Sequence, residues 1–101
     1  MDLTAGSRWK SAVCETEVVV VRPPGRAAVL GCGGAEMVPS SAGGGRGTPD
    51  PELAQGTQLG KRYADEGSGI EVLCTKAGDG TLTLDGAPLG LKGAKPLPSS
   101  D

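Results

Sequence analysis

Hydrophobic and polar positions alternate in two segments of this chain, 70–75 and 81–84, whereas residues 18–21 are four consecutive valines. Glu17 and Arg22 bracket this run with opposite charges. Consecutive β-branched residues favour a strand, here expected over residues 15–22, and they make both of its faces apolar. Such a strand is buried on both faces or lies partly in an interface, so we expect the fold to be organised around it.

The residues after the valines predict a β-hairpin. The Pro-Pro-Gly sequence at 23–25 indicates a turn, because prolines cannot donate hydrogen bonds to a strand ladder. A second strand at 27–30, a tight Gly-Cys-Gly-Gly corner at 31–34 and a third strand at 35–38, ended by Pro39, are predicted to follow.

The second half of the chain shows a similar pattern. Residues 70–75 alternate, which predicts a strand with Ile70, Val72 and Cys74 on one buried face. A hairpin loop at 77–80, an alternating strand at 81–84, a two-residue Asp85-Gly86 turn and a last strand at 88–91 are predicted to follow. Residues 18–37 and 70–89 also align without gaps at an offset of 52, which indicates a weak internal repeat.

These elements predict a mainly β protein with small antiparallel sheets. Two three-stranded β-meanders are expected to pack together through their apolar faces. One short helical turn is expected near 50–55, with Asp50 as its cap and Pro51 at its first position. The expected divisions are a disordered lead-in at 1–10 in which Trp9 docks, a meander at 11–39, a Gly/Pro-rich linker at 40–56, a second meander at 57–92 and an extended tail at 93–101.

Composition and charge narrow the possible partners. The chain has no phenylalanine, one tryptophan and one tyrosine, so few aromatic rings could stack on bases. The net charge is −2 and no block of like charge occurs, so nucleic-acid binding is not expected. No stretch approaches the ~18 apolar residues of a membrane span, and the N-terminus lacks the apolar core of a signal peptide. We therefore expect no membrane partner and a cytoplasmic location.

The chain contains no histidine. This excludes Ser–His and Cys–His nucleophilic pairs, imidazole acid–base catalysis and histidine-containing metal sites. The GGGRG sequence at 43–47 is not followed by Lys-Ser or Lys-Thr, so it does not match a phosphate-binding loop. We expect the protein not to be an enzyme, with no catalytic and no cofactor-binding residues.

The remaining chemistry lies in three cysteines. Val13-Cys14, a hairpin of valines, Cys32-Gly33 and the Glu-Met-Val sequence at 36–38 resemble the desulforedoxin fold, which also forms the N-terminal domain of desulfoferrodoxins. In that family a Cys-x-x-Cys knuckle precedes the hairpin, a Cys-Cys-Gly pair follows it, and the four thiolates hold one iron. The resemblance covers about residues 11–38 and implies a half-lost metal site in this chain.

Only two positions match ligands of that family. Ser11 stands where the family has its first knuckle cysteine, and Gly31 stands where it has the first cysteine of the pair. Two thiolates do not make a rubredoxin-type site, which needs four sulfur ligands.

Three interpretations of the cysteines follow. Cys14 and Cys32 could be buried remnants of a metal-binding ancestor. They could bind a soft metal, Fe or Zn, with Cys74 as a third ligand or with two chains each supplying two thiolates. They could also be a redox-active or disulfide-forming pair. Because the two arms of the expected hairpin are nearly equal, their Cα atoms are expected about 4–8 Å apart. Cys74, inward on an alternating strand, is expected to be a core residue.

Two functions from different classes fit these features. The first is a non-catalytic accessory or protein-interaction module without cofactor, which docks on a larger partner protein or self-associates. The thin core, the two-faced valine strand and the proline-containing tail favour it. The alternative is a metal-binding (Fe or Zn) or redox carrier protein related to desulforedoxin, using Cys14, Cys32 and Cys74.

Overall fold

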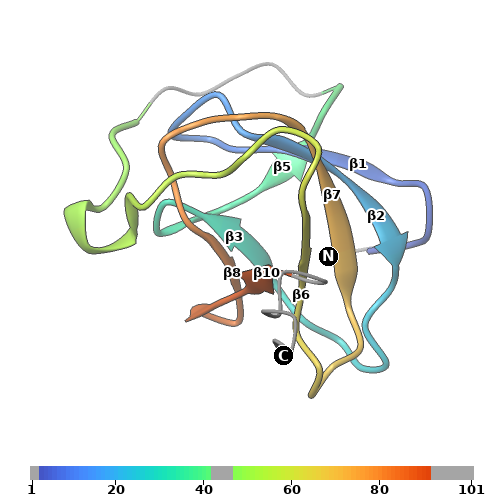
Figure 1. Cartoon of the computed structure of the whole chain (residues 1–101). Helices are drawn as coiled ribbons and strands as arrows, with labels where there is room; N and C mark the ends of the chain where they lie inside the picture. The colour runs from blue at the N-terminus through green and yellow to red at the C-terminus, as the bar shows by residue number, and fades with distance from the viewer. Residues whose placement is uncertain (1–2, 42–46, 92–101) are drawn as a thin grey trace, which may run out of the picture.

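The computed structural model describes residues 3–41 and 47–91 of the chain (Figure 1). Within these residues the chain forms ten strands and one 3-10 turn: β1 (Arg8–Lys10), β2 (Glu17–Arg22), β3 (Leu30–Cys32), β4 (Ala35–Glu36), β5 (Val38–Pro39), η1 (Pro51–Leu53), β6 (Arg62–Ala64), β7 (Glu71–Lys76), β8 (Leu82–Leu84), β9 (Ala87–Pro88) and β10 (Gly90–Leu91). The prediction of a mainly β protein with one short helical turn is confirmed. In the part of the chain described, no helix is long and apolar enough to cross a membrane.

The strands form two antiparallel sheets. One has six strands in the order β10-β6-β7-β2-β1-β5, and the other has four in the order β4-β3-β8-β9. Each sheet therefore contains strands from both halves of the chain. Antiparallel sheets were expected, but the division into two three-stranded meanders is wrong, because the central pairs β2–β7 and β3–β8 join the two halves.

The predicted hairpin of residues 15–30 does not form. Strand β2 pairs with β1 and β7, whereas β3 lies in the other sheet, so the Pro-Pro-Gly segment carries the chain between sheets. The physical reason is length: β2 and β7 are the two six-residue strands and pair with each other, with Val20 opposite Val72. The loop at 77–80 likewise connects β7 to β8 across the two sheets instead of closing a hairpin.

Two predictions of local structure are confirmed, in contrast to the predictions of strand pairing. Ile70, Val72 and Cys74 are all buried, as their alternation indicated. The Asp85-Gly86 turn connects the paired strands β8 and β9, and both of its residues have a positive φ.

The segments expected as single strands at 35–38 and 88–91 are each divided between the two sheets. The divisions fall at Met37 and Leu89, whose side chains are buried. The backbone N–H groups of these two residues donate equivalent 2.9 Å bonds to Leu30 O and Leu82 O.

The N-terminal segment is also more ordered than predicted. Arg8–Lys10 forms β1 between β2 and β5, and Leu3 and Trp9 are buried, so residues 3–10 are not a disordered lead-in. The indole N–H of Trp9 donates a 3.0 Å hydrogen bond to Ser7 Oγ. The glycine-rich part of the predicted linker, at 42–46, and the predicted tail at 93–101 lie outside the described residues.

The two sheets have an internal two-fold pseudo-symmetry. Each of the strands β1 to β5 has a counterpart among β6 to β10, in the same sequence order. Exchanging every strand with its counterpart gives the order of each sheet in reverse. Equivalent hydrogen bonds confirm the relation: Gly6 N–H donates to Val20 O at 2.7 Å, and 54 positions later Gly60 N–H donates to Cys74 O at 2.9 Å. A repeated structural unit therefore exists, but the gapless repeat predicted at an offset of 52 matches it only from β3 and β8 onward, since the equivalent residues of β2 and β7 are 54 positions apart.

The turn η1 is anchored to the first half of the chain. Asp50 caps it as predicted, with its carboxylate accepting a 2.9 Å bond from Glu52 N–H, and Pro51 is its first residue. The Asp50 N–H donates to Gly33 O at 2.8 Å. This bond places the turn beside the end of β3, where Cys32 lies.

Candidate functional site

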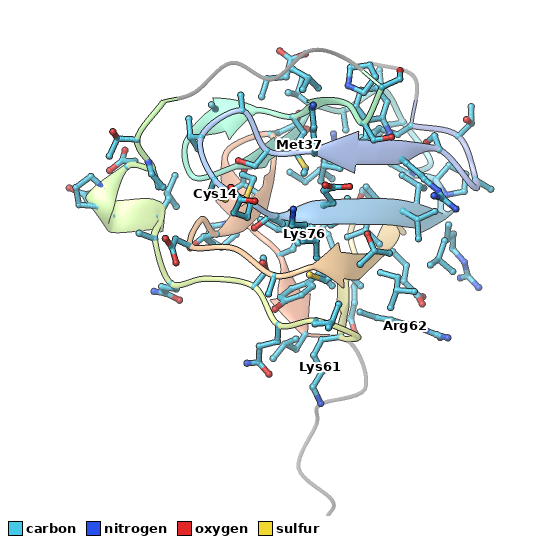
Figure 2. The ribbon with its side chains drawn as sticks, turned by 90° about the horizontal axis from the view of Figure 1, so that it is seen from above. Cys14, Met37, Lys61, Arg62 and Lys76 are labelled. Atoms are coloured by element: carbon cyan, nitrogen blue, oxygen red, sulfur yellow. The ribbon has the colours of Figure 1, made fainter. Side chains whose placement is uncertain are left out.

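The structure brings Cys14, in a loop of the six-stranded sheet, close to Cys32 in the four-stranded sheet. Cys14 lies in the loop between β1 and β2, on the side of the molecule that carries η1 (Figure 2), and Cys32 is the last residue of β3. Their sulfur atoms are 3.7 Å apart. Cys14 is partly exposed, whereas Cys32 is fully buried. One thiol can therefore be reached from solvent while the other lies directly behind it.

The loop that carries Cys14 is closed by Ser11. The buried Ser11 hydroxyl accepts hydrogen bonds from the N–H groups of Val13 and Cys14, at 3.0 and 3.1 Å. The Ser11 N–H donates to Thr16 O at 2.8 Å and closes the loop at its base. Ser11, which the resemblance marks only as a lost ligand, instead positions the cysteine three residues later.

Hydrogen-bonding groups surround the Cys14 sulfur. The Gly80 N–H donates to it at 3.3 Å, and the thiol can donate to Thr16 Oγ1 at 3.2 Å. Thr16 Oγ1 also lies 2.9 Å from Thr57 Oγ1, which accepts a 3.0 Å bond from Gly78 N–H. When Thr57 donates to Thr16, the Thr16 hydroxyl proton can turn toward a Cys14 thiolate. The buried threonine pair can therefore stabilise either protonation state of Cys14.

These contacts favour the ionised form of Cys14. Partial burial raises the pKa of the Cys14 thiol, but hydrogen bonds from the Ser11 and Thr16 side chains and from the Thr16 and Gly80 backbones outweigh burial. Together they lower the pKa to about 7. A large share of Cys14 is therefore thiolate, the reactive form of cysteine, at neutral pH.

Cys32 has the opposite environment. Burial first, and then the negative charge of the neighbouring Cys14, raise the pKa of the Cys32 thiol to about 12. Cys32 is thus a protonated thiol beside an ionised and partly exposed one. This asymmetry is typical of a pair in which one cysteine attacks and the other resolves.

Glycines allow the backbone to approach the two sulfurs. A Cβ at Gly80 would lie 2.9 Å from both Cys32 Sγ and Gly33 N. A Cβ at Gly78 would collide with the backbone N and the hydroxyl of Thr16. The Ala-Gly-Asp-Gly loop, which the sequence indicated only as a turn, is therefore also a wall of the thiol site.

Cys74 is not part of this site. It lies on β7, is buried, and its thiol donates a 3.2 Å bond to Lys76 O. Among residues 3–41 and 47–91, no group of three or more Cys, Asp or Glu residues is arranged to hold a metal ion. The two sulfurs of one chain do not fit the four-sulfur site of the desulforedoxin family.

The second half of the chain shows that the fold does not require these thiols. The loop at 65–70 is equivalent to the Cys14 loop: Asp65 N–H donates to Ile70 O at 3.2 Å, and the Asp65 carboxylate accepts a 3.0 Å bond from Ser68 N–H. Ser68 stands at the position of Cys14 in this loop, and Leu84 stands at the position of Cys32 in the strand. The thiol pair is therefore a feature of one half only.

The chain matches no family of known proteins, no curated protein and no solved structure. The resemblance to desulforedoxin therefore stays a prediction. At Gly31, where that family has a cysteine, a Cβ would lie 2.7 Å from Thr83 Oγ1 across the β3–β8 pair, so a larger residue would need the threonine to move.

Sequence reasoning found Cys14 and Cys32 but missed Ser11, Thr16 and Gly80 as functional residues. The hydroxyl residues at positions −3 and +2 from Cys14 were a local signal. Gly80 is 66 positions from Cys14, and nothing in the sequence connects the two.

Removal of the Thr16 hydroxyl should make Cys14 less acidic. The rate at which 4,4′-dithiodipyridine modifies Cys14 should depend on pH, with an inflection near pH 7 in the wild type. In Thr16→Val we expect this inflection to move upward by about one pH unit, because a hydrogen bond to a charged group contributes ~1.5 kcal/mol. Mass spectrometry would assign the modified cysteine. Thr83→Val, which removes another buried hydroxyl, is the control and should leave the profile unchanged. An unchanged profile in Thr16→Val would contradict the assigned role.

Proposed function

We propose that this protein is a small thiol–disulfide redox carrier in which Cys14 attacks a disulfide of a partner and Cys32 resolves the product. The observation that supports this best is the 3.7 Å separation of two sulfurs of which only Cys14 is open to solvent. The hydroxyl and N–H groups around Cys14 give it the character of an attacking thiol.

The proposed exchange has two steps. The Cys14 thiolate attacks one sulfur of the partner disulfide R–S–S–R′, forms the mixed disulfide Cys14–S–S–R and releases R′–S⁻. Cys32 then attacks the Cys14 sulfur and forms the Cys14–Cys32 disulfide, while its proton passes to the departing sulfur, which leaves as R–SH. Two electrons pass from the dithiol to the partner, and the reverse reaction returns them.

The first step prepares the second. Cys14 carries no charge once it is in a mixed disulfide, so its contribution to the raised pKa of Cys32 disappears. Burial, the largest cause, keeps Cys32 protonated while Cys14 makes the first attack. This order protects the resolving thiol from reacting first.

Two features favour this proposal over the interpretations of the cysteines as remnants or as metal ligands. Remnant cysteines would not need the hydroxyl and N–H groups that surround the Cys14 sulfur. Within residues 3–41 and 47–91, no third Cys, Asp or Glu is grouped with the two sulfurs, whereas iron or zinc needs at least three protein ligands. As a carrier the protein would be turned over by a partner and not act as an enzyme by itself. A cytoplasmic location, where thiol pools keep cysteines reduced, belongs to the same proposal.

Equilibration in glutathione redox buffers, followed by acid quenching and peptide mapping, tests the proposal. We expect one reversible disulfide, Cys14–Cys32, with a midpoint potential above about −300 mV and Cys74 remaining a thiol. Cys74→Ala should behave like the wild type, whereas Cys32→Ser should accumulate a mixed disulfide at Cys14. A disulfide that never forms, or one that glutathione cannot reduce, would contradict the proposal. Stoichiometric iron or zinc in anaerobically purified protein would favour the metal-binding alternative.

A further inference from the structure

The outer face of the six-stranded sheet, the face directed away from the core, carries a row of opposed residues. Arg8 pairs with Val19, Val19 pairs with Leu73, and Leu73 pairs with Arg62. Residues directly opposite in a sheet share a face. The two adjacent rows, Trp9–Val18–Cys74 and Val20–Val72–Tyr63, are buried in the core. The arginine-flanked row therefore points outward.

Further charged residues lie on either side of this row. Lys10 is opposite Glu17, which is opposite Lys76 across a register shift in β7. At the other end of the sheet Arg22 is opposite Glu71. We call these nine residues the outer face: Arg8, Lys10, Glu17, Val19, Arg22, Arg62, Glu71, Leu73 and Lys76.

Charge is strongly segregated onto the outer face. Of the seven cationic side chains in the described residues, five lie on it, together with only two of the ten carboxylates, which leaves it with a net charge of +3. The other described residues carry two cationic side chains, Arg26 and Lys61, and eight carboxylates. A chain with an overall charge of −2 thus presents one basic face.

The cationic groups of the outer face are accessible. The Arg62 side chain extends away from the strands (Figure 2) and is 59% exposed although it contacts Glu71 at 3.4 Å. The Lys76 side chain is 55% exposed although it contacts Glu15 at 3.1 Å. The Lys76–Glu15 pair is exposed on both sides, so Lys76 can exchange partners at low cost. Arg62 instead covers Glu71, whose side chain is only 6% exposed, and presents its own exposed part to solvent.

The outer face also adjoins the thiol site. Lys76 contacts Glu15, the residue that follows Cys14, and it lies opposite Glu17, three residues after Cys14. The Lys76 end of the outer face therefore lies beside the loop that carries Cys14.

We propose that the outer face docks an acidic protein, the partner whose disulfide reacts with Cys14. The proposal rests on the proposed redox function and adds the chemistry of the partner. The basic face attracts an acidic surface and repels a basic one, which selects among the disulfides that could otherwise reach Cys14.

Activated peptide disulfides test this selection. Three peptides of equal length, acidic, neutral and basic, each carry one cysteine as a mixed disulfide with thionitrobenzoate, whose release is followed by absorbance. The acidic peptide should react with the wild-type protein about tenfold faster than the neutral one at low salt, because opposite charges steer association. The preference should fall below about twofold at ~0.5 M salt, where such charges are screened.

Two double variants with the same change in net charge locate the effect. Arg8→Gln/Arg62→Gln, on the outer face, should reduce the preference for the acidic peptide at least about threefold. Arg26→Gln/Lys61→Gln removes the two described cations that lie elsewhere and should retain it. Both variants should react with uncharged 4,4′-dithiodipyridine at the wild-type rate, which shows that fold and thiol are intact.

The outcomes separate the two proposals. A Cys14 that reacts with dithiodipyridine no faster than a free thiol at neutral pH would overturn the redox function itself. A reactive Cys14 without preference for the acidic peptide, or an equal loss in both double variants, would overturn only the docking proposal. Binding of a DNA oligonucleotide more tightly than the acidic peptide would overturn it as well, because the outer face would then bind polyanions other than proteins.

Discussion

Replacing Val20 by aspartate should destabilise the fold by about 3–5 kcal/mol, since a buried charge without a partner costs this much. Val20 is 1% exposed and faces Val72 in the central pair of the six-stranded sheet. A small domain has only about 5–15 kcal/mol of stability, so most of it would be lost. Urea denaturation followed by circular dichroism measures the change in the free energy of unfolding.

Val21→Asp is the matched control for this experiment. The neighbouring Val21 lies at the register shift of β2 and is 42% exposed, so an aspartate there remains solvated. We expect a loss of about 1 kcal/mol or less for this variant. Equal losses in the two variants would show that the face of β2 directed into the core has been assigned wrongly.

Oxidation of Cys14 and Cys32 should stabilise the protein by about 3 kcal/mol. The disulfide would close a loop between cysteines 18 positions apart, and the cross-link restricts the unfolded chain. The sulfurs need to approach from 3.7 Å to about 2 Å, a small movement for one partly exposed side chain. By linkage, the same free energy places the midpoint potential of the folded pair about 60 mV below that of the unfolded pair.

Urea denaturation with and without dithiothreitol measures this difference. Wild type and Cys74→Ala should show the redox-dependent increase in stability, whereas Cys14→Ser and Cys32→Ser should show none. An oxidised protein less stable than the reduced one would mean that the disulfide strains the junction of the two sheets, contrary to the proposed reversible pair.

Several local features could be predicted from the sequence because neighbouring residues determine them. The alternation around Val72 places Val72 and Cys74 of β7, and Ile70 just before it, on one buried face. Asp85-Gly86 forms its turn because both residues tolerate a positive φ. Asp50 caps its helical turn through a bond to the N–H group two residues later.

The proximity of the two thiols was expected, but for the wrong reason. We expected a hairpin with nearly equal arms to bring Cys14 and Cys32 to the same end of a single sheet. The structure places β2 and β3 in different sheets, and the sulfurs meet because the loop after β1 covers the end of β3. The pairing of β2 with β7 determines this arrangement. The sequence of either strand alone does not indicate which distant strand it pairs with.

By itself, the sequence determined the two longest strands, β2 and β7, their inward faces and the Asp85-Gly86 turn, because backbone preference and side-chain periodicity act over a few residues. Only the tertiary structure decided which strands are neighbours, and with them the two properties that give this protein its proposed chemistry. Gly80 donates to Cys14 from 66 positions away, which helps to lower the pKa of that thiol. Arg8 and Arg62, one from each half of the chain, share one face only because β2 and β7 pair between them.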